Sequence, residues 1–427
     1  MKHPTILYWV SRALRTHDNQ AFHQAQQIAL NQNAQLIILF NAYPKYPHAN
    51  LRNMDFLLKG LAEMSAKCAA LNIPLYFRVG NILDHLTDLN KDFDIQHIIT
   101  EAHVLRPILA VQALVSNWAY TSNIRFTKVN TACVVPVQIA SPKLEFAART
   151  FRPKILKQYK EYLNQDLSLI PHPQDLSLGD RFTTNDIDTF YQNHPLMPLS
   201  ISKLTPGEDA AIKQLDAFIQ NGLDHYDQRN RIDANGQSYL SAYLHYGMLS
   251  PIKMIRDVLN TQHPNAELFI EEAMVRRELA ENYCFYNSNY DKLEGAWPWA
   301  IETLKRHEND ERPYLYSRET LEKAQTHDDL WNHCQRRVVD EGYLHSYLRM
   351  YWAKMVLLWT KNATEAIDIL VYLNDTYLLD GRDPNGYTGI LWSVAGVHDR
   401  PWFDRPVFGL IRAMGKDGSL KKTGIKL

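Results

Sequence analysis

The apolar runs TILYWV (Thr5–Val10) and QLIILF (Gln35–Phe40) enclose the helix-like stretch AFHQAQQIALN (Ala21–Asn31). Runs of this length that are rich in β-branched and aromatic residues indicate buried strands, and their alternation with helices is typical of a parallel sheet. The same pattern continues in Met54–Leu71, Leu75–Val79, Ile95–Thr100, Val104–Ser116 and Ile124–Val129. The first part of the chain is therefore predicted to be a doubly wound, Rossmann-like α/β domain.

A ligand of such a sheet would bind at the carboxyl ends of its strands. The chain contains no G-x-G-x-x-G pattern and no P-loop, and it has 17 Gly among 427 residues. We therefore do not expect a dinucleotide held by a glycine-rich turn.

The pattern changes after the fifth strand-length run. Residues 141–205 are rich in Pro, Asp and Asn, and the segments SLIPHPQDLSLGD (Ser168–Asp180) and NHPLMPLS (Asn193–Ser200) indicate connecting loop. From Pro206 onward the apolar residues follow helical spacing. We predict three parts, which are an α/β domain over residues 1–135, an interdomain linker over 136–205 and an all-α domain over 206–427.

Candidate helices fill the third part. Their starts often carry an Asn, Asp, Ser or Thr cap, or an early Pro as at Pro251. No internal repeat is present. The candidates are Glu208–Asn221, Ser238–Tyr246, Pro251–Asn260, Ala266–Tyr286, Arg318–Ala324, Asp329–Glu341, Leu344–Trp359 and Thr364–Leu373.

Composition excludes several classes of protein. With 45% hydrophobic and 22% charged residues the chain is ordinary for a globular protein, and its formal net charge of −1 excludes a protein that is basic throughout. A nucleic-acid site must then be a local basic patch, and residues 405–427 contain six Lys or Arg and one acid, Asp417. No long apolar segment indicates a signal peptide or a membrane span. We expect a soluble, cytoplasmic monomer.

Metal and disulfide chemistry is not expected. The cysteines are far apart and form no C-x-x-C pair, which argues against a zinc site and against a disulfide framework. They are Cys68, Cys133, Cys284 and Cys334.

One carboxylate stands out in the helical part. Glu272 shares a helical stripe with Leu268, Val275 and Leu279, and burying a carboxylate is costly unless it is paired or used. Arg276, four residues on, could form an ordinary surface pair with it. The alternative is a carboxylate at a ligand site, and the spacing leaves both open.

Tryptophan is concentrated in the same part. Seven of the nine Trp lie between Trp297 and Trp402. Trp352 and Trp359 are seven residues apart, which places them about 10 Å apart along one helix face, and Trp331 lies on the preceding candidate helix. Such indoles can simply pack in the core, or they can form a chain through which one electron hops. Composition leaves both open.

Two polar segments contain several glycines. LNDTYLLDGRDPNGYTGILWS (Leu373–Ser393) interrupts the helical pattern, and glycine permits a close approach of backbone or ligand. Its polar groups suit either a capped loop or a bound polar heteroaromatic cofactor. GQSYLSAYLHYG (Gly236–Gly247) places Ser238 and Ser241 at a helix start, where hydroxyls and free N–H groups serve either a phosphate or an ordinary cap.

The helical part contains, in this order, VRRELAEN (Val275–Asn282), THDDLWN (Thr326–Asn332), LRMYWAK (Leu348–Lys354), LNDTYLLDGRDPNGY (Leu373–Tyr387) and RPVFGLIRAM (Arg405–Met414). Together they resemble the motifs of class II cyclobutane pyrimidine dimer photolyases. YWVSRALRTHDNQAF (Tyr8–Phe22) and EFAARTFRPKI (Glu145–Ile155) are also similar to that family. The resemblance covers nearly the whole chain. The chain departs from the pattern at Ser346, where Gly is usual, and in its last residues, KDGSLKKTGIKL.

The resemblance implies that the all-α domain binds FAD, which is active in its reduced form. Arg349 and Asp380 match an ion pair beside the flavin ring, and Asn374 matches the asparagine that faces flavin N5. The spacing around Tyr226 departs by one residue, so His225 is its rival. The implied FAD-binding residues are Tyr226, Ser238, Leu240, Ser241, Arg277, Arg349, Asn374 and Asp380.

Further roles follow from the same resemblance. Trp331, Trp352 and Trp359 match a triad that carries electrons to photo-oxidised flavin. Glu272 matches a glutamate that hydrogen-bonds the pyrimidine dimer. The other implied substrate residues are Arg229, which enters the gap in the duplex, Met350 and Trp392, which line the dimer pocket, and Arg276, at a position where class II members commonly have Arg.

The implied function is light-driven repair of cyclobutane pyrimidine dimers in UV-damaged DNA, by electron transfer from excited reduced FAD to a dimer flipped out of the helix. The alternative is a blue-light sensor of the cryptochrome type. Cryptochromes often carry long C-terminal extensions, whereas this chain ends shortly after its last motif, and Glu272 and Met350 favour repair. The family also admits an antenna chromophore in the α/β domain, whose identity the sequence leaves open.

Overall fold

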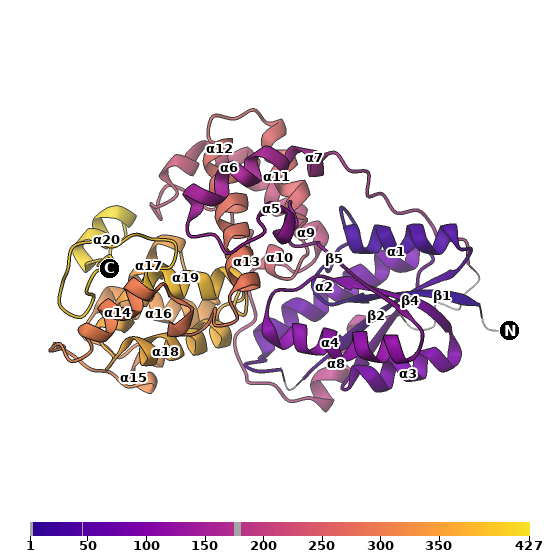
Figure 1. Ribbon diagram of the computed structural model, residues 1–427, viewed down its shortest axis with the longest axis horizontal. Helices are drawn as coiled ribbons and strands as arrows, with labels where there is room; N and C mark the ends of the chain where they lie inside the picture. Colours follow the sequence, from indigo (N-terminus) through magenta and orange to yellow (C-terminus); the bar gives the residue numbers. More distant parts are fainter. Residues whose placement is uncertain (1–2, 45, 175–180) are drawn as a thin grey trace. The chain divides into compact units, whose positions relative to one another are not determined.

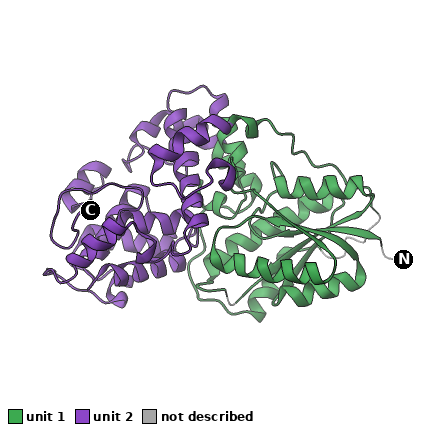
Figure 2. Ribbon diagram, in the orientation of Figure 1, with its two compact units in different colours: residues 1–136, 160–215, 240–257 green, residues 137–159, 216–239, 258–427 purple. Residues whose placement is uncertain are grey.

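The computed structural model describes residues 3–44, 46–174 and 181–427. The chain divides into two compact units, which Figure 2 colours separately. Unit 1 comprises residues 1–136, 160–215 and 240–257, and unit 2 comprises residues 137–159, 216–239 and 258–427. The predicted boundaries at residues 135 and 205 assume contiguous domains, whereas each unit draws on three separate segments. Composition along the sequence divides the chain into consecutive parts, so it does not show that a later segment belongs to the same unit as an earlier one.

Unit 1 is built on a five-stranded parallel sheet with the strand order β3-β2-β1-β4-β5 (Figure 1). The interior strands are almost wholly buried, as a parallel sheet covered on both faces requires. The predicted doubly wound α/β fold is confirmed. Its elements are β1 (Pro4–Val10), α1 (Gln20–Asn31), β2 (Gln35–Ala42), α2 (Leu51–Ala70), β3 (Leu75–Val79), α3 (Ile82–Asp92), β4 (Asp94–Glu101), α4 (Arg106–Thr121) and β5 (Arg125–Val129).

The region 141–205 is less loop-like than expected. It contains α6 (Ala148–Gln158), α7 (Lys160–Leu163) and α8 (Thr184–Asn193). Thr183 and Asp186 form a reciprocal capping box at the start of α8, which buries Ile187 and Phe190. A short helix with two buried residues leaves little periodicity to detect, so the prediction of loop is wrong here. Of the expected loop Ser168–Asp180, residues 175–180 lie outside the described residues.

The remaining elements of unit 1 are short helices. They are α9 (Glu208–Ala217), α10 (Ser241–His245) and α11 (Pro251–Asn260), of which α9 and α11 end in unit 2.

Among its described residues, the regular secondary structure of unit 2 is helical, as predicted, apart from an isolated bridge between Arg405 and Gly409. Its α17, α18 and α19 pack together in the core. Its elements are α5 (Val137–Ala140), α6, η1 (Phe218–Gly222), η2 (Leu223–Gln228), α12 (Ala266–Ile270), η3 (Glu271–Arg276), α13 (Arg277–Tyr286), η4 (Leu293–Gly295), α14 (Pro298–Arg306), α15 (Arg318–Glu322), α16 (Asp329–Glu341), α17 (Ser346–Leu358), α18 (Ala363–Tyr377), α19 (Pro384–Ala395) and α20 (Lys416–Thr423).

The segment Leu373–Ser393 does not interrupt the helices as far as predicted. Helix α18 runs to Tyr377 and α19 begins at Pro384, so only residues 378–383 form a turn. Asp383 caps α19 by accepting from the backbone N–H of Asn385 at 2.9 Å. Helix ends therefore account for most of the polar residues that suggested a long loop.

Three further observations bear on membrane, metal and disulfide chemistry. Within the described ranges no helix is long and apolar enough to cross a membrane. Nor does that part of the chain hold a group of three or more His, Cys, Asp or Glu that could bind a metal ion. All four cysteines are buried free thiols.

Candidate active site

Glu272 lies at the centre of a group of charges in unit 2. Its Oε1 accepts from Arg229 Nη2 at 3.1 Å, and its Oε2 lies 3.4 Å from Arg276 Nε. The ordinary i,i+4 pair is therefore present, but a second cation joins from a segment 43 residues away. The Glu272 side chain is 35% exposed, so the carboxylate is open to a ligand.

The predicted apolar stripe through Glu272 is wrong at one end. Leu268 is 40% exposed, whereas Val275 and Leu279 are each 1% exposed. Between them lies η3, a π-helical turn, which adds a residue to the turn and shifts the face that follows. The same turn places Glu272 at the edge of the buried face.

Arg229 is held in place by His345. The N–H of Tyr347 donates to His345 Nδ1 at 3.2 Å, so the ring proton sits on Nε2, which donates to the carbonyl of Arg229 at 2.9 Å. Burial lowers the pKa of His345 and so favours this neutral ring. The Arg229 guanidinium also lies 5.2 Å from the ring centroid of Tyr226. Sequence reasoning did not assign His345 this role, since only the folded chain brings it to residue 229.

Trp392 packs against Arg276, the i+4 partner of Glu272. The Arg276 guanidinium lies 5.3 Å from its ring centroid, and the ring of His398 meets it edge-on at 6.1 Å. His398 Nδ1 donates to the carbonyl of Phe146 at 2.9 Å. Burial, aided by the charge of Arg276, lowers the pKa of His398 to about 4. The ring is therefore neutral near pH 7.

We expect His398 to make stability depend on pH. An unfolded histidine has a pKa of about 6.5, so the unfolded chain binds more protons below that pH. Stability is therefore full above pH 6.5 and falls towards pH 4, by about 3 kcal/mol from this group. Urea unfolding at pH 7.5 and 4.5 measures the loss. His398→Asn, which tolerates the backbone φ of 66° at this position, should lose less stability on acidification. Equal losses in both proteins would contradict the assignment.

A second group of site residues lies on α17 and after α18. Arg349 Nη2 donates to both carboxylate oxygens of Asp380 at 2.9 Å, and Arg349 Nε donates to the carbonyl of Leu344 at 3.0 Å. The predicted partners thus form an ion pair. Its position beside a flavin ring stays a prediction.

Asn374 is 3% exposed. Its Nδ2 donates to Asp375 Oδ1 at 2.8 Å, while its Oδ1 has no hydrogen-bond partner among the described residues. A Cβ atom on Gly386 would lie 2.9 Å from Asn374 Nδ2, so glycine is needed for α19 to approach this amide. Asp375 Oδ2 accepts from the hydroxyl of Tyr387 at 2.8 Å. Asp375 is therefore satisfied by the protein, and the side-chain oxygen of Asn374 remains available as an acceptor.

The three predicted tryptophans are connected. Trp331 Nε1 donates to the carbonyl of Trp352 at 2.9 Å, and the rings of Trp331 and Trp359 lie 5.7 Å apart at 73°. Each indole is at most 2% exposed. Gln335, which the sequence did not single out, accepts from Trp352 Nε1 at 2.8 Å. His327 packs edge-on against Trp359 at 5.1 Å.

The other predicted site residues are less closely grouped. Tyr226 is 7% exposed and His225 is exposed. Arg277 is buried at the start of α13, and Met350 on α17 is 36% exposed. Helix α10 begins at Ser241 rather than at Ser238. The expected phosphate-binding residues are divided between the units, with Ser238 in unit 2 and both Leu240 and Ser241 in unit 1.

Unit 1 has a polar cluster at the carboxyl ends of β1 and β4, where the strand order reverses. Glu101 accepts from the hydroxyl of Tyr8 at 2.6 Å and from the hydroxyl of Ser11 at 2.6 Å. The Ser11 hydroxyl also lies 3.0 Å from His103 Nε2. Ligands of doubly wound sheets bind at this edge.

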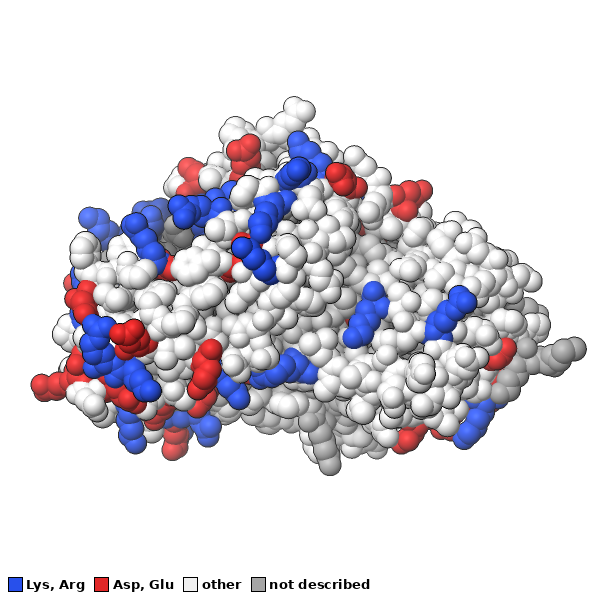
Figure 3. Space-filling view, viewed as in Figure 1, with Lys and Arg blue, Asp and Glu red and all other residues white. Residues whose placement is uncertain are grey.

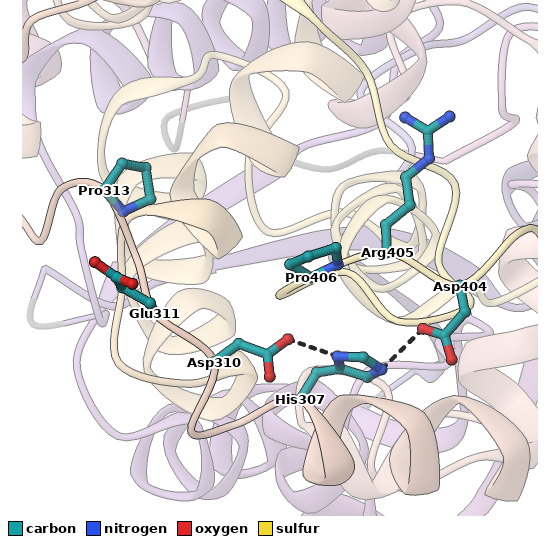
Figure 4. A pocket seen from close by; sticks show the side chains of 7 residues that line it. All are labelled: His307, Asp310, Glu311, Pro313, Asp404, Arg405 and Pro406. Atoms are coloured by element: carbon teal, nitrogen blue, oxygen red, sulfur yellow. Dashed lines mark hydrogen bonds and ion pairs between the residues drawn. The ribbon is translucent and has the colours of Figure 1, made fainter.

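A cavity of about 670 Å³ in unit 2 is lined by none of the predicted site residues (Figure 4). His307 Nδ1 lies 2.6 Å from Asp310 Oδ2, and His307 Nε2 lies 2.8 Å from Asp404 Oδ1. Asp310 also accepts from the backbone N–H of Val407 at 2.8 Å. These contacts tie the chain after α19 to the end of α14 and have a structural role.

Comparisons with known proteins agree on one family. A model of the DNA photolyase family matches residues 6–174. The chain is 39% identical to a deoxyribodipyrimidine photo-lyase of Potorous tridactylus, over 98% of this chain and 80% of that protein. It is 37% identical to one of Arabidopsis thaliana, over 98% of this chain and 87% of that protein. Among solved structures, a Synechocystis cryptochrome has a TM-score of 0.74 at 18% identity, covering 95% of this chain and 85% of that one, which shows the fold.

Proposed function

The chain belongs to the DNA photolyase family, and from that premise we propose that it acts as a deoxyribodipyrimidine photo-lyase, which uses light to repair cyclobutane pyrimidine dimers in UV-damaged DNA. The observation that carries the proposal is the partly exposed carboxylate of Glu272 between Arg229 and Arg276, with Trp392 packed against the Arg276 guanidinium. A carboxylate accepts hydrogen bonds from pyrimidine N–H groups, and an indole offers a flat apolar surface to a base. The class II assignment rests on the motifs in the helical part.

We further propose that the chain holds FAD, with most of the proposed binding residues in unit 2. The Oδ1 of Asn374, for which no hydrogen bond to a described residue is found, suits an N–H donor of a reduced flavin ring, and the charge of Arg349 is balanced by Asp380. When bound, reduced FAD supplies, after absorbing blue light, the electron that opens the cyclobutane ring. The proposed FAD-binding residues are Tyr226, Ser238, Leu240, Ser241, Arg277, Arg349, Asn374 and Asp380.

The chain's own residues bind and orient the substrate. Glu272 fixes the dimer by hydrogen bonds, while Met350 and Trp392 supply apolar contact. Arg229, which His345 holds in place, occupies the gap that a flipped dimer leaves in the duplex. We also propose that Trp331, Trp352 and Trp359 deliver electrons to an oxidised cofactor. A cytoplasmic monomer and an antenna chromophore in unit 1 remain predictions from the sequence.

The test is a repair assay. Purified protein with chemically reduced cofactor is mixed with dimer-containing duplex DNA, and the remaining dimers are counted after blue light or darkness. We expect dimers to disappear only in the light. Binding without repair by the fully reduced protein would contradict the proposal and favour the alternative, a blue-light sensor of the cryptochrome type.

A further inference from the structure

The C-terminal helix α20 presents two lysines that the fold does not use. Its Ser419 and Thr423 are buried, and Lys416 forms an ion pair with Asp329. Lys421 and Lys422 are exposed, and within the described residues neither has an ion-pair partner. Exposed lysines that are not paired are free to bind an anion.

The end of helix α20 is hydrogen-bonded to the segment that follows Arg229. The carbonyl of Thr423 accepts from the N–H of Ile232 at 2.9 Å, and a Cβ atom on Gly424 would lie 3.1 Å from Arg231 Nη2. Ile232 is three residues from Arg229, and a chain of that length spans at most about 11 Å. Arg229 in turn donates to the Glu272 carboxylate at 3.1 Å, so the segment that contacts α20 is continuous with the candidate site.

The charge around α20 is not isolated. Figure 3 shows Lys and Arg side chains gathered over the region where Figure 1 places this helix. Arg231 lies beside it but is occupied by Asp233 at 2.6 Å, whereas Lys421 and Lys422 form no ion pair among the described residues. Since the formal net charge of the chain is −1, attraction for a polyanion must come from such local surfaces.

We propose that Lys421 and Lys422 bind phosphates of the DNA that flanks the damaged site. This inference rests on the proposed function, because continuity with Glu272 and Arg229 is what selects DNA among polyanions. Phosphates are the same in damaged and undamaged DNA, so these contacts position the duplex and do not recognise the lesion. The lysines should therefore strengthen binding to both kinds of DNA equally.

The test measures the affinity of the full-length, cofactor-loaded protein for duplex DNA with and without a dimer, between 50 and 300 mM salt. We expect Lys421→Gln/Lys422→Gln to lower the slope of log affinity against log salt by about 1.8, since each phosphate contact contributes about 0.9. At 0.1 M salt this amounts to roughly a 10- to 60-fold loss for both DNAs. Lys421→Arg/Lys422→Arg should keep the wild-type slope.

The matched control is Lys305→Gln/Lys361→Gln, which removes two other exposed lysines of unit 2. It should leave the slope within a few tenths of wild type. An unchanged slope in the Lys421/Lys422 variant, or an equal loss in the control, overturns the proposal. Both outcomes differ from failure of the proposed function, in which the wild-type protein itself repairs no dimers.

Discussion

Replacing Trp331 with Phe will abolish photoreduction of the bound flavin and leave repair intact once the cofactor is reduced chemically. Trp331 contacts both of the other tryptophans, because its N–H binds the backbone carbonyl of Trp352 and its ring meets that of Trp359 at 5.7 Å. Phenylalanine is harder to oxidise than tryptophan and cannot donate that hydrogen bond. The loss of oxidised-flavin absorbance under blue light, with a thiol as the final reductant, measures the effect. Trp359→Phe should behave in the same way.

The control must separate electron transfer from packing. Trp299 is a partly buried tryptophan of α14 in the same unit, so Trp299→Phe makes the same chemical change away from the three indoles. It should photoreduce at the wild-type rate. Photoreduction of Trp331→Phe as fast as that of this control would show that the three tryptophans only pack the core.

The elements predicted best are those whose pattern is local. Three elements have the predicted bounds, namely strand Leu75–Val79 and helices Pro251–Asn260 and Asp329–Glu341. A buried apolar run, or an amphipathic repeat with a cap, can be recognised within a few residues of sequence. Helix α8 was missed because it buries only two residues. The stripe through Leu268 failed because a π turn changes the helical period, and residue spacing assumes a constant one.

The members proposed for the candidate site come from the sequence, whereas their contacts could be seen only in the fold. Motifs identified Glu272, Arg349 and Asp380 one by one. Spacing along one helix suggested only Arg276 as a partner of Glu272, whereas the closer cation is Arg229, from a distant segment. The same holds for His345, whose hydrogen bond to residue 229 spans 116 positions. Contacts between distant segments depend on how helices pack, which a single sequence does not encode in its local pattern.

The charge around the carboxylate has two separable consequences. Arg229 and Arg276 attract any DNA, because phosphates are common to every site. The negative charge of Glu272 repels phosphates, so we expect this residue to strengthen binding only where a base donates N–H groups to its carboxylate. We expect such a site to bind undamaged DNA less tightly and to prefer dimer-containing DNA more strongly. Replacing Glu272 should therefore raise the affinity for undamaged DNA and lower the preference for the dimer.

We therefore expect Glu272→Gln to lower the preference for dimer-containing over undamaged DNA about ten- to a hundredfold. A hydrogen bond to a charged acceptor contributes about 1.5 to 3 kcal/mol, and each 1.4 kcal/mol is a tenfold change in affinity. The affinity for undamaged DNA should rise slightly, because the variant lacks the negative charge of Glu272, which repels phosphates. Competition binding with the two DNAs at fixed salt measures the ratio.

The neighbouring Glu271 supplies the control, since Glu271→Gln removes the same charge one residue away. Both oxygens of its carboxylate already accept from Arg152 at 2.7 Å, and its side chain is 21% exposed against 35% for Glu272, so it is less available to a base. We expect Glu271→Gln to keep the wild-type preference for the dimer. If both variants lost it equally, the effect would be one of charge alone and Glu272 would not touch the dimer. The lysine variant of α20 should differ from Glu272→Gln in kind, because it weakens binding to both DNAs and leaves their ratio unchanged.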